Sequence, residues 1–269
     1  MPDSPTPSPT PDYGLDAPGA VRNLFIIGGI ALVALLAIVT HLWSGKLTLG
    51  GGDFNLRPMS VGLTVGCLGM GAWMVWDSKV GKVRERERLL DLLTWTGRER
   101  VLDVGCGRGL MLIGAAKRLT TGTAAGIDLW QAEDLSGNRP EATLDNARLE
   151  GVAERVEVVT GDMRKIPFPD VSFDTVLSMM AIHNIYSAPG RDTAIAEICR
   201  VLKPGGSVLI VDIRHIRQYA AALRAGGCTD VRYASSDFGT KVVAIITLGL
   251  VRPGNLIGRN DADAALARA

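Results

Sequence analysis

Charged and aromatic residues are both scarce in this chain of 269 residues: Asp, Glu, Lys and Arg make up 21% of it, and Phe, Trp and Tyr only 5%. The charges nearly cancel, because 29 basic residues stand against 28 acidic ones. This balance excludes a generally basic nucleic-acid binder and a highly charged disordered chain. The mean hydropathy of +0.19 is too high for an ordinary soluble enzyme, so the apolar excess must be concentrated in particular segments.

Cysteine and histidine are also few, with four and three copies. The cysteines lie far apart, without a CxxC pair or a His/Cys cluster, so we expect neither a disulfide framework nor a metal site. Reduced thiols in a cytosolic setting are the simpler interpretation. The cysteines are Cys67, Cys106, Cys199 and Cys228.

The apolar excess lies in two runs without formal charge, Leu24–Trp43 and Pro58–Trp76, joined by a glycine-rich loop over Ser44–Arg57. Twenty helical residues at about 1.5 Å each span the roughly 30 Å hydrocarbon core of a bilayer. A signal peptide is the alternative for the first run, but its preceding tail is acidic and proline-rich, and a second run follows. We therefore predict two transmembrane helices.

Basic residues cluster directly after the second run, whereas the short loop holds only Lys46 and Arg57. Because positively charged flanks stay on the cytoplasmic side, we expect both termini and everything after residue 77 in the cytoplasm. The clustered residues are Lys79, Lys82, Arg84, Arg86 and Arg88.

The chain divides into four predicted segments. Residues 1–22 form a proline-rich tail that we expect to be disordered, with a polyproline ligand as the alternative. Residues 23–76 form the two-helix anchor, residues 77–255 form one folded domain, and residues 256–269 form a C-terminal tail.

Short apolar runs alternate with helical segments in the third part, which predicts an α/β fold with a parallel sheet covered on both faces. The last two strand-like runs, Asp230–Ala234 and Val242–Val251, have no helix between them, so one strand must be antiparallel. The earlier predicted strands are Val101–Val104, Ala124–Asp128, Val156–Thr160, Thr175–Met179 and Ser207–Asp212. The predicted helices are Val80–Trp95, Leu110–Leu119, Glu141–Glu150, Arg191–Leu202 and His215–Arg224.

The segment Val101–Leu110 (VLDVGCGRGL) is a strand, a glycine-rich turn and a helix start. Such a turn lets the backbone come close to a ligand at a helix N-terminus. Asp128 ends the next strand, where a carboxylate can accept from ribose hydroxyls. Asp103 precedes the glycines and would repel a pyrophosphate but attract an ammonium group. A Rossmann-like domain for another nucleotide is the alternative.

At these residues the chain resembles the class I S-adenosylmethionine-dependent methyltransferases, over about residues 79–251. The resemblance implies S-adenosylmethionine as cofactor and a Rossmann-like seven-stranded sheet of order 3-2-1-4-5-7-6 with strand 7 antiparallel. The motifs that carry it are VLDVGCGRG, GID (126–128), GDM (161–163), FDTVLSMMAIHNI (173–185) and RVLKPGGSVLIVD (200–212).

The resemblance also implies roles for single residues around the cofactor. The methionine and ribose part is lined by Gly105, Cys106, Gly107 and Gly109, with Asp103 and Ser178 near the ammonium group. Asp128 holds the ribose hydroxyls, Leu129 or Trp130 packs on adenine, and the adenine amino group meets Gly161, Asp162 and Met163. Ordinary packing is the alternative for Trp130 and Met163, and the favoured one for Cys106.

Two histidines, His183 and His215, follow strands 4 and 5, whose carboxyl ends face the ligand in this fold. Either is a candidate general base, and a structural hydrogen bond at a helix start is the alternative for both. Asn184 and Tyr186 are candidate substrate contacts. The insertion Gln131–Pro140 follows strand 2 and is a candidate lid.

Strand 4 ends in SMMAIHN rather than in the (D/N)PP(Y/F) motif of amino-directed DNA methyltransferases, so we expect no nucleic-acid partner. We predict a membrane-anchored methyltransferase for a small or lipid-like acceptor, methylated on oxygen or carbon. Two alternatives stay open: a soluble acceptor methylated beside the membrane, and a membrane protein that binds S-adenosylmethionine without catalysis. The sequence names neither the acceptor nor the oligomeric state.

Overall fold

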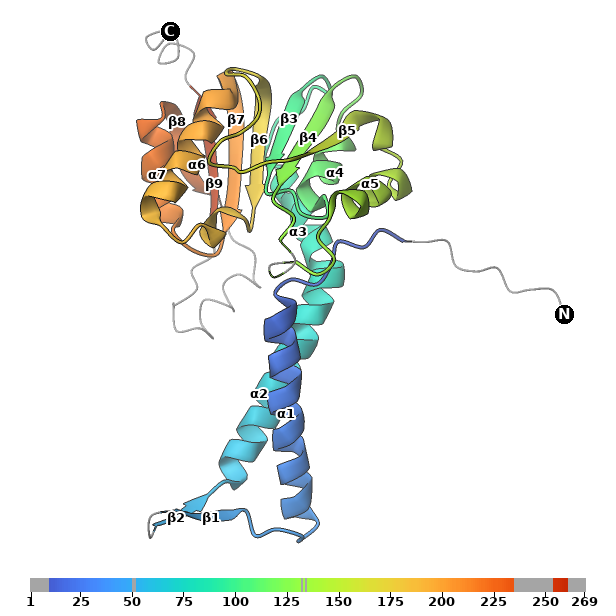
Figure 1. The fold of residues 1–269 in the computed structure, drawn as a ribbon, viewed down its shortest axis with the longest axis vertical. Helices are drawn as coiled ribbons and strands as arrows, with labels where there is room; N and C mark the ends of the chain where they lie inside the picture. The colour runs from blue at the N-terminus through green and yellow to red at the C-terminus, as the bar shows by residue number, and fades with distance from the viewer. Residues whose placement is uncertain (1–9, 50–51, 132, 134, 235–253, 261–269) are drawn as a thin grey trace, which may run out of the picture. The chain divides into compact units, whose positions relative to one another are not determined.

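A computed structural model describes residues 10–49, 52–131, 133, 135–234 and 254–260 (Figure 1). The chain separates into two compact units. The α/β unit comprises Met1–Tyr13, Val83–Trp130 and Asn138–Ala269, and the helical unit comprises Gly14–Lys82 and Gln131–Gly137. The motifs quoted above all lie in the α/β unit.

The α/β unit is built on a seven-stranded sheet of order β5-β4-β3-β6-β7-β9-β8. The first five strands along the chain are parallel, and β9 runs antiparallel to both β7 and β8. This confirms the predicted order with its reversed strand. The strands are β3 (Arg100–Val104), β4 (Thr123–Asp128), β5 (Val156–Thr160), β6 (Phe173–Met179), β7 (Leu202–Asp212), β8 (Cys228–Ala234) and β9 (Gly254–Asn260).

Helices cover both faces of this sheet, as the continuous apolar strands require. Neighbouring strand residues point to opposite faces: Val101 packs with α3, α4 and α5, whereas Leu102 packs with α6 and α7. The helices are α3 (Lys82–Leu90), α4 (Leu110–Ala116), α5 (Pro140–Leu149), α6 (Ala188–Val201) and α7 (Ile216–Ala225). The carboxyl ends of the parallel strands lead into the loops that carry the predicted site.

The helical unit pairs α1 (Pro18–Val39) with α2 (Arg57–Trp76), which continues through a π-helical turn over Asp77–Gly81. The helices approach closely at glycines: a Cβ on Gly28 would lie 2.7 Å from Leu68 Cδ2, and one on Gly71 would lie 3.2 Å from the Phe25 ring. The predicted connecting loop contains a small antiparallel hairpin, β1 (Lys46–Leu49) and β2 (Gly52–Asn55).

Two predicted segment boundaries are wrong. The C-terminal tail was expected from residue 256, but β9 occupies Gly254–Asn260, where Leu256 and Ile257 are buried. The predicted strand Val242–Val251 lies outside the described residues. At the other end, α1 begins at Pro18 and Tyr13 is buried, so the expected disorder does not extend to residue 22. Proline suits the first helical turn because its missing N–H needs no partner there.

Candidate cofactor and acceptor site

The glycine loop between β3 and α4 has the backbone that a close ligand approach needs. Gly105, Gly107 and Gly109 have φ values of 76°, 52° and 86°, a region that disfavours other residues. A Cβ on Gly105 would lie 2.2 Å from Cβ of Ala181. The loop therefore lies directly against the segment that follows β6.

Asp103 is buried beneath this loop. Its Oδ2 accepts a hydrogen bond from Leu112 N at 2.8 Å, whereas Oδ1 is buried and has no hydrogen-bond partner among the described residues. Burial raises the pKa of the carboxyl group to about 7. A buried acceptor without a donor suits the cationic ammonium group of an amino-acid ligand.

Asp128 ends β4 and already holds the glycine loop in place. Its Oδ2 accepts from Gly107 N at 2.8 Å, and its Oδ1 accepts from Trp130 N at 2.6 Å and from Asn138 Nδ2 at 3.2 Å. A carboxylate offers about four acceptor positions, so room for a further donor is left. Asn138, in the predicted lid, is a partner that the sequence did not reveal.

The residues expected around adenine are spread along neighbouring strand ends. The Trp130 indole donates to Thr160 Oγ1 at 2.8 Å, and Leu129 is exposed. Gly161 N donates to the backbone oxygen of Asp128 at 3.1 Å. The side chain of Asp162 is paired with Arg164, whose hydrogen bonds lower the pKa of the carboxyl group.

Met163 and Cys106 both take part in packing. Met163 packs against the core, and its Cε lies 3.5 Å from the position of a Cβ on Gly105. Cys106 is buried, and burial raises the pKa of its thiol well above the ordinary value. Its sulfur occupies the space left by Gly126, where a Cβ would lie 2.7 Å away. Packing is thus the observed role of Cys106.

Ser178 joins the strand ends below the loop. It is buried, and its Oγ donates to the backbone oxygen of Val104 at 2.9 Å. Its hydroxyl therefore ties β6 to β3 at the edge where Gly105 begins the glycine loop.

His183 is held by Asp212, which ends β7. The backbone N of His183 donates to Asp212 Oδ2 at 3.0 Å, and its ring Nδ1 lies 2.5 Å from Oδ1, at ion-pair distance but without the alignment of a hydrogen bond. Asp212 is buried and also accepts from Ile213 N and from the Tyr219 hydroxyl. Sequence reasoning missed Asp212, although it closes the last quoted motif.

The other candidate acceptor contacts are placed less favourably. His215 precedes α7 with φ of 60°, and partial burial together with Arg191 lowers the pKa of its ring. Asn184 is half-buried in the same short helix as His183. Tyr186 is fully exposed, at 100%. His183 combines partial burial with a buried carboxylate, Asp212, that holds it.

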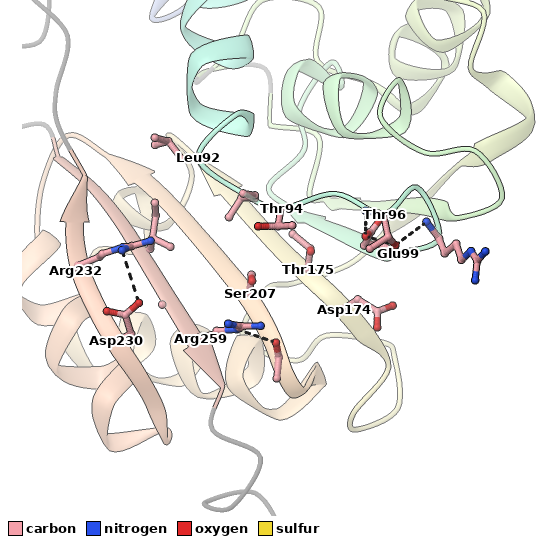
Figure 2. A pocket seen from close by; sticks show the side chains of 15 residues that line it. Leu92, Thr94, Thr96, Glu99, Asp174, Thr175, Ser207, Asp230, Arg232 and Arg259 are labelled. Carbon is pink, nitrogen blue, oxygen red and sulfur yellow. Dashed lines mark hydrogen bonds and ion pairs between the residues drawn. The ribbon is translucent and has the colours of Figure 1, made fainter.

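A cavity of about 480 Å³ lies elsewhere in the α/β unit (Figure 2). Its lining includes Thr175, near the amino end of β6, and Ser207, which pairs with Thr175 in β7, together with Asp230, Arg232 and Arg259. Ligands of such sheets bind at the carboxyl ends of the strands. The glycine loop and His183 lie at those ends and do not line this cavity.

Comparison with known proteins identifies the domain and its cofactor. Residues 102–210 match the family model described as a methyltransferase domain, and the cofactor of this domain is S-adenosylmethionine. The buried, unpartnered oxygen of Asp103 and the tight glycine backbone fit that cofactor.

Among the similar proteins, methyltransferase GfsG of Streptomyces halstedii is 34% identical over 149 residues, covering 54% of this chain and 50% of its own. Phosphatidylethanolamine N-methyltransferase of Cereibacter sphaeroides is 33% identical over 141 residues, covering 52% and 64%. The chain thus spans about half to two thirds of these relatives.

A similar fold is seen in geranyl diphosphate C-methyltransferase from Streptomyces coelicolor A3(2). Its TM-score is 0.52 at 16% identity, covering 66% of this chain and 75% of that one. At this identity the similarity supports the fold alone.

Proposed function

Starting from the methyltransferase domain at residues 102–210, we propose that this chain is a membrane-anchored S-adenosylmethionine-dependent methyltransferase acting on a small, apolar or membrane-associated acceptor. One observation carries the catalytic part. The glycine loop abuts Ala181, and His183, which follows along the same segment, faces Asp212 at the end of β7. Cofactor-binding backbone and a candidate base therefore meet at one edge of the sheet.

The chain's own residues divide the work at this edge. Asp128 and the glycine loop bind the cofactor, and Asp103 offers its unpartnered oxygen to the ammonium group. When bound, S-adenosylmethionine supplies a methyl group activated by a sulfonium centre. His183 faces Asp212 through Nδ1, which leaves Nε2 to take a proton from a hydroxyl or an activated carbon. Asp212 is a positioning residue that orients the ring.

The membrane part of the proposal rests on the helical unit. Two helices, Pro18–Val39 and Arg57–Leu90, are long and apolar enough to cross a bilayer. A core helix of a soluble protein would be mostly buried, whereas only 22% and 11% of these apolar stretches are buried. Val33 and Val65 are 68% and 70% exposed. A hydrocarbon environment would satisfy these side chains.

An apolar acceptor follows from the anchor, since an enzyme in the bilayer gains most when its substrate is concentrated there. The relative from Cereibacter sphaeroides is named as an N-methyltransferase of phosphatidylethanolamine, which is a membrane lipid. A soluble acceptor beside the membrane, or cofactor binding without catalysis, are the competing functions.

The test uses the full chain in vesicles with S-adenosylmethionine labelled on its methyl group and a fractionated membrane extract. We expect label in an apolar product. His183→Ala and Asp212→Asn should each lower kcat by about 10²-fold or more, with the Kd of S-adenosylhomocysteine unchanged. The double variant should lose little more than the worse single one, because the pair acts as a unit.

Each alternative has its own result. Label that enters only water-soluble compounds would favour a soluble acceptor. Binding of S-adenosylhomocysteine without any turnover would favour the non-catalytic function. If His183→Ala keeps the full kcat, His183 is not the base, although the protein is still a methyltransferase.

A further inference from the structure

Two residues of the proline-rich N-terminal segment, Asp12 and Tyr13, are bound to the α/β unit, and we name them the N-terminal strap. The backbone N of Asp12 donates to Asn146 Oδ1 at 2.9 Å, and the backbone O of Asp12 accepts from Asn146 Nδ2 at 2.9 Å. The side-chain amide of Asn146 thus pairs with the strap backbone in both directions. Asn146 is buried on α5.

The same amide also reaches the glycine loop. Asn146 Nδ2 donates to the backbone oxygen of Arg108 at 3.0 Å, and the Arg108 side chain forms an ion pair with Asp12 at 3.0 Å. One turn away, Thr143 Oγ1 donates to the backbone oxygen of Gly107 at 2.6 Å. Two carbonyl groups of the glycine loop therefore accept hydrogen bonds from side chains of α5. One of these donors, the Asn146 amide, also donates to the strap.

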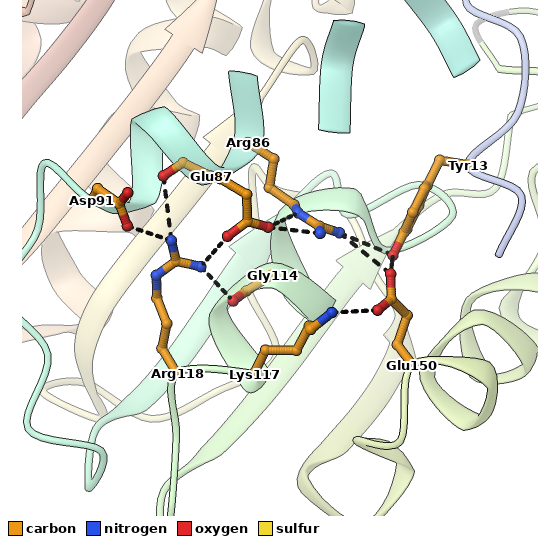
Figure 3. A network of polar contacts seen from close by, with 8 residues as sticks. All are labelled: Tyr13, Arg86, Glu87, Asp91, Gly114, Lys117, Arg118 and Glu150. Carbon is orange, nitrogen blue, oxygen red and sulfur yellow. Dashed lines mark hydrogen bonds and ion pairs between the residues drawn. The ribbon is translucent and has the colours of Figure 1, made fainter. Parts of the chain in front are cut away.

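Tyr13 fixes the other half of the strap (Figure 3). It is 7% exposed, and its hydroxyl donates to Glu150 Oε1 at 2.9 Å and accepts from Arg86 Nη1 at 3.0 Å. The Arg86 guanidinium also lies 5.5 Å from the centre of the ring. Burial raises the pKa of the hydroxyl, so it stays a neutral donor.

We infer that the N-terminal strap is a positioning element for the cofactor: Asp12, acting through Asn146, holds the glycine loop in its binding conformation. Tyr13 anchors the strap through its bonds to Glu150 and Arg86. The inference rests on the proposed binding of S-adenosylmethionine by that loop. Glycines with positive φ are loosely constrained by themselves, and an external clamp lowers the ordering cost at binding.

The test compares Tyr13→Ala, Asn146→Asp and their double variant in the full chain, purified in detergent micelles. Asn146→Asp keeps the shape but loses the donor to Asp12 and Arg108. We expect the Kd of S-adenosylhomocysteine, measured by calorimetry, to rise about tenfold in each single variant. The double variant should rise far less than a hundredfold, because both changes release the same loop. At saturating S-adenosylmethionine, kcat should stay within twofold.

A second readout needs no cofactor. Hydrogen exchange of the peptide that covers Gly105–Gly109 should be faster in both variants of the cofactor-free protein. The matched control is Val201→Ala. This change removes buried volume from the part of the core that α6 and α7 form on the sheet, and Tyr13 is not in that part. Its unfolding temperature should fall, while the Kd and the exchange of the glycine loop stay unchanged.

The outcomes separate the two claims. An unchanged Kd and unchanged loop exchange in Tyr13→Ala and Asn146→Asp would overturn the strap. The same rise in Kd in Val201→Ala would show that a general loss of stability weakens cofactor binding, and the strap would then have no specific role. If the wild-type protein binds no S-adenosylhomocysteine, the proposed function is wrong. Hydrogen exchange of the glycine loop in the variants would still show whether the strap orders the loop.

Discussion

At the scale of single residues, Asp103 is a carboxyl group held where ionisation is unfavourable. Burial raises its pKa to about 7, against an ordinary value of 3.8. The backbone N of Leu112 satisfies one oxygen, and the other has no partner among the residues described. In the free protein the group is therefore largely protonated below neutral pH, and a cationic ligand would favour its ionised form.

This shift predicts a pH dependence of stability. The folded chain holds a proton on Asp103 between pH 4 and pH 7 that the unfolded chain releases. The contribution of Asp103 to the free energy of unfolding is therefore fully present below about pH 4 and is lost as pH rises to about 7. Each unit of pKa difference corresponds to about 1.4 kcal/mol.

Urea unfolding of the wild type and of Asp103→Asn across this range measures the effect. We expect the wild type to lose stability relative to the variant as pH rises from 4 to 7. A constant difference between the two proteins over that range would contradict the burial of an ionisable Asp103.

At the scale of elements, the start of α7 carries a strained residue. His215 occupies the position before the helix with φ of 60° and ψ of 12°, a left-handed conformation, and its side chain makes no cap hydrogen bond. Such a conformation costs about 1 kcal/mol for a residue with a Cβ. The short helix Ile182–Asn184, which carries His183, is instead held by a hydrogen bond to Asp212 at the end of β7.

Replacing His215 by Gly should therefore stabilise the fold by about 1 kcal/mol, because glycine adopts this conformation without strain. Thermal or urea unfolding measures the gain, and His215→Ala, which keeps the Cβ, is the matched control that should show no gain. A loss of kcat in His215→Gly comparable to that of His183→Ala would make His215 the base.

At the scale of the whole molecule, the basic cluster after α2 is less available to a membrane surface than its composition suggests. Lys82 is buried and donates to the backbone oxygen of Gly14 at 2.8 Å and to Asp16. Arg86 is buried against Tyr13, and Arg88 pairs with Glu85. Lys79 and Arg84 are the exposed members. Fewer exposed charges than the sequence suggests are therefore available to hold this flank on the cytoplasmic side.

The proposed orientation predicts opposite labelling of two exposed positions. Thr48→Cys, in β1, should react with a membrane-impermeant maleimide added outside intact cells. Thr94→Cys, in the α/β unit, should react only after permeabilisation. Both are made with Cys67 and Cys199, the two cysteines that are not fully buried, replaced by Ser. Equal labelling of both positions in intact cells would contradict two spans.

The sequence alone determined the features that depend on local pattern. Alternating apolar strands and helices predicted a parallel sheet with one antiparallel strand near its end, and β9 is that antiparallel strand. The observed strand order is the one that the resemblance to the class I methyltransferases implied. The glycine loop was predictable because positive φ at close-packed positions favours one residue type. The two apolar runs were predictable because length and hydropathy need no tertiary information.

Only the tertiary structure decided which distant residues meet. Asn146 joins Asp12 across 134 positions in sequence, and Asp212 joins His183 across 29. A proline-rich segment has no periodic pattern that would reveal a buried tyrosine. Likewise Gly28 and Gly71 lie at the contact between α1 and α2, whereas a Cβ on Gly62 or on Gly66 would meet nothing within 4 Å. Each such contact depends on the packing of elements far apart in the chain, and one-dimensional spacing does not encode that packing.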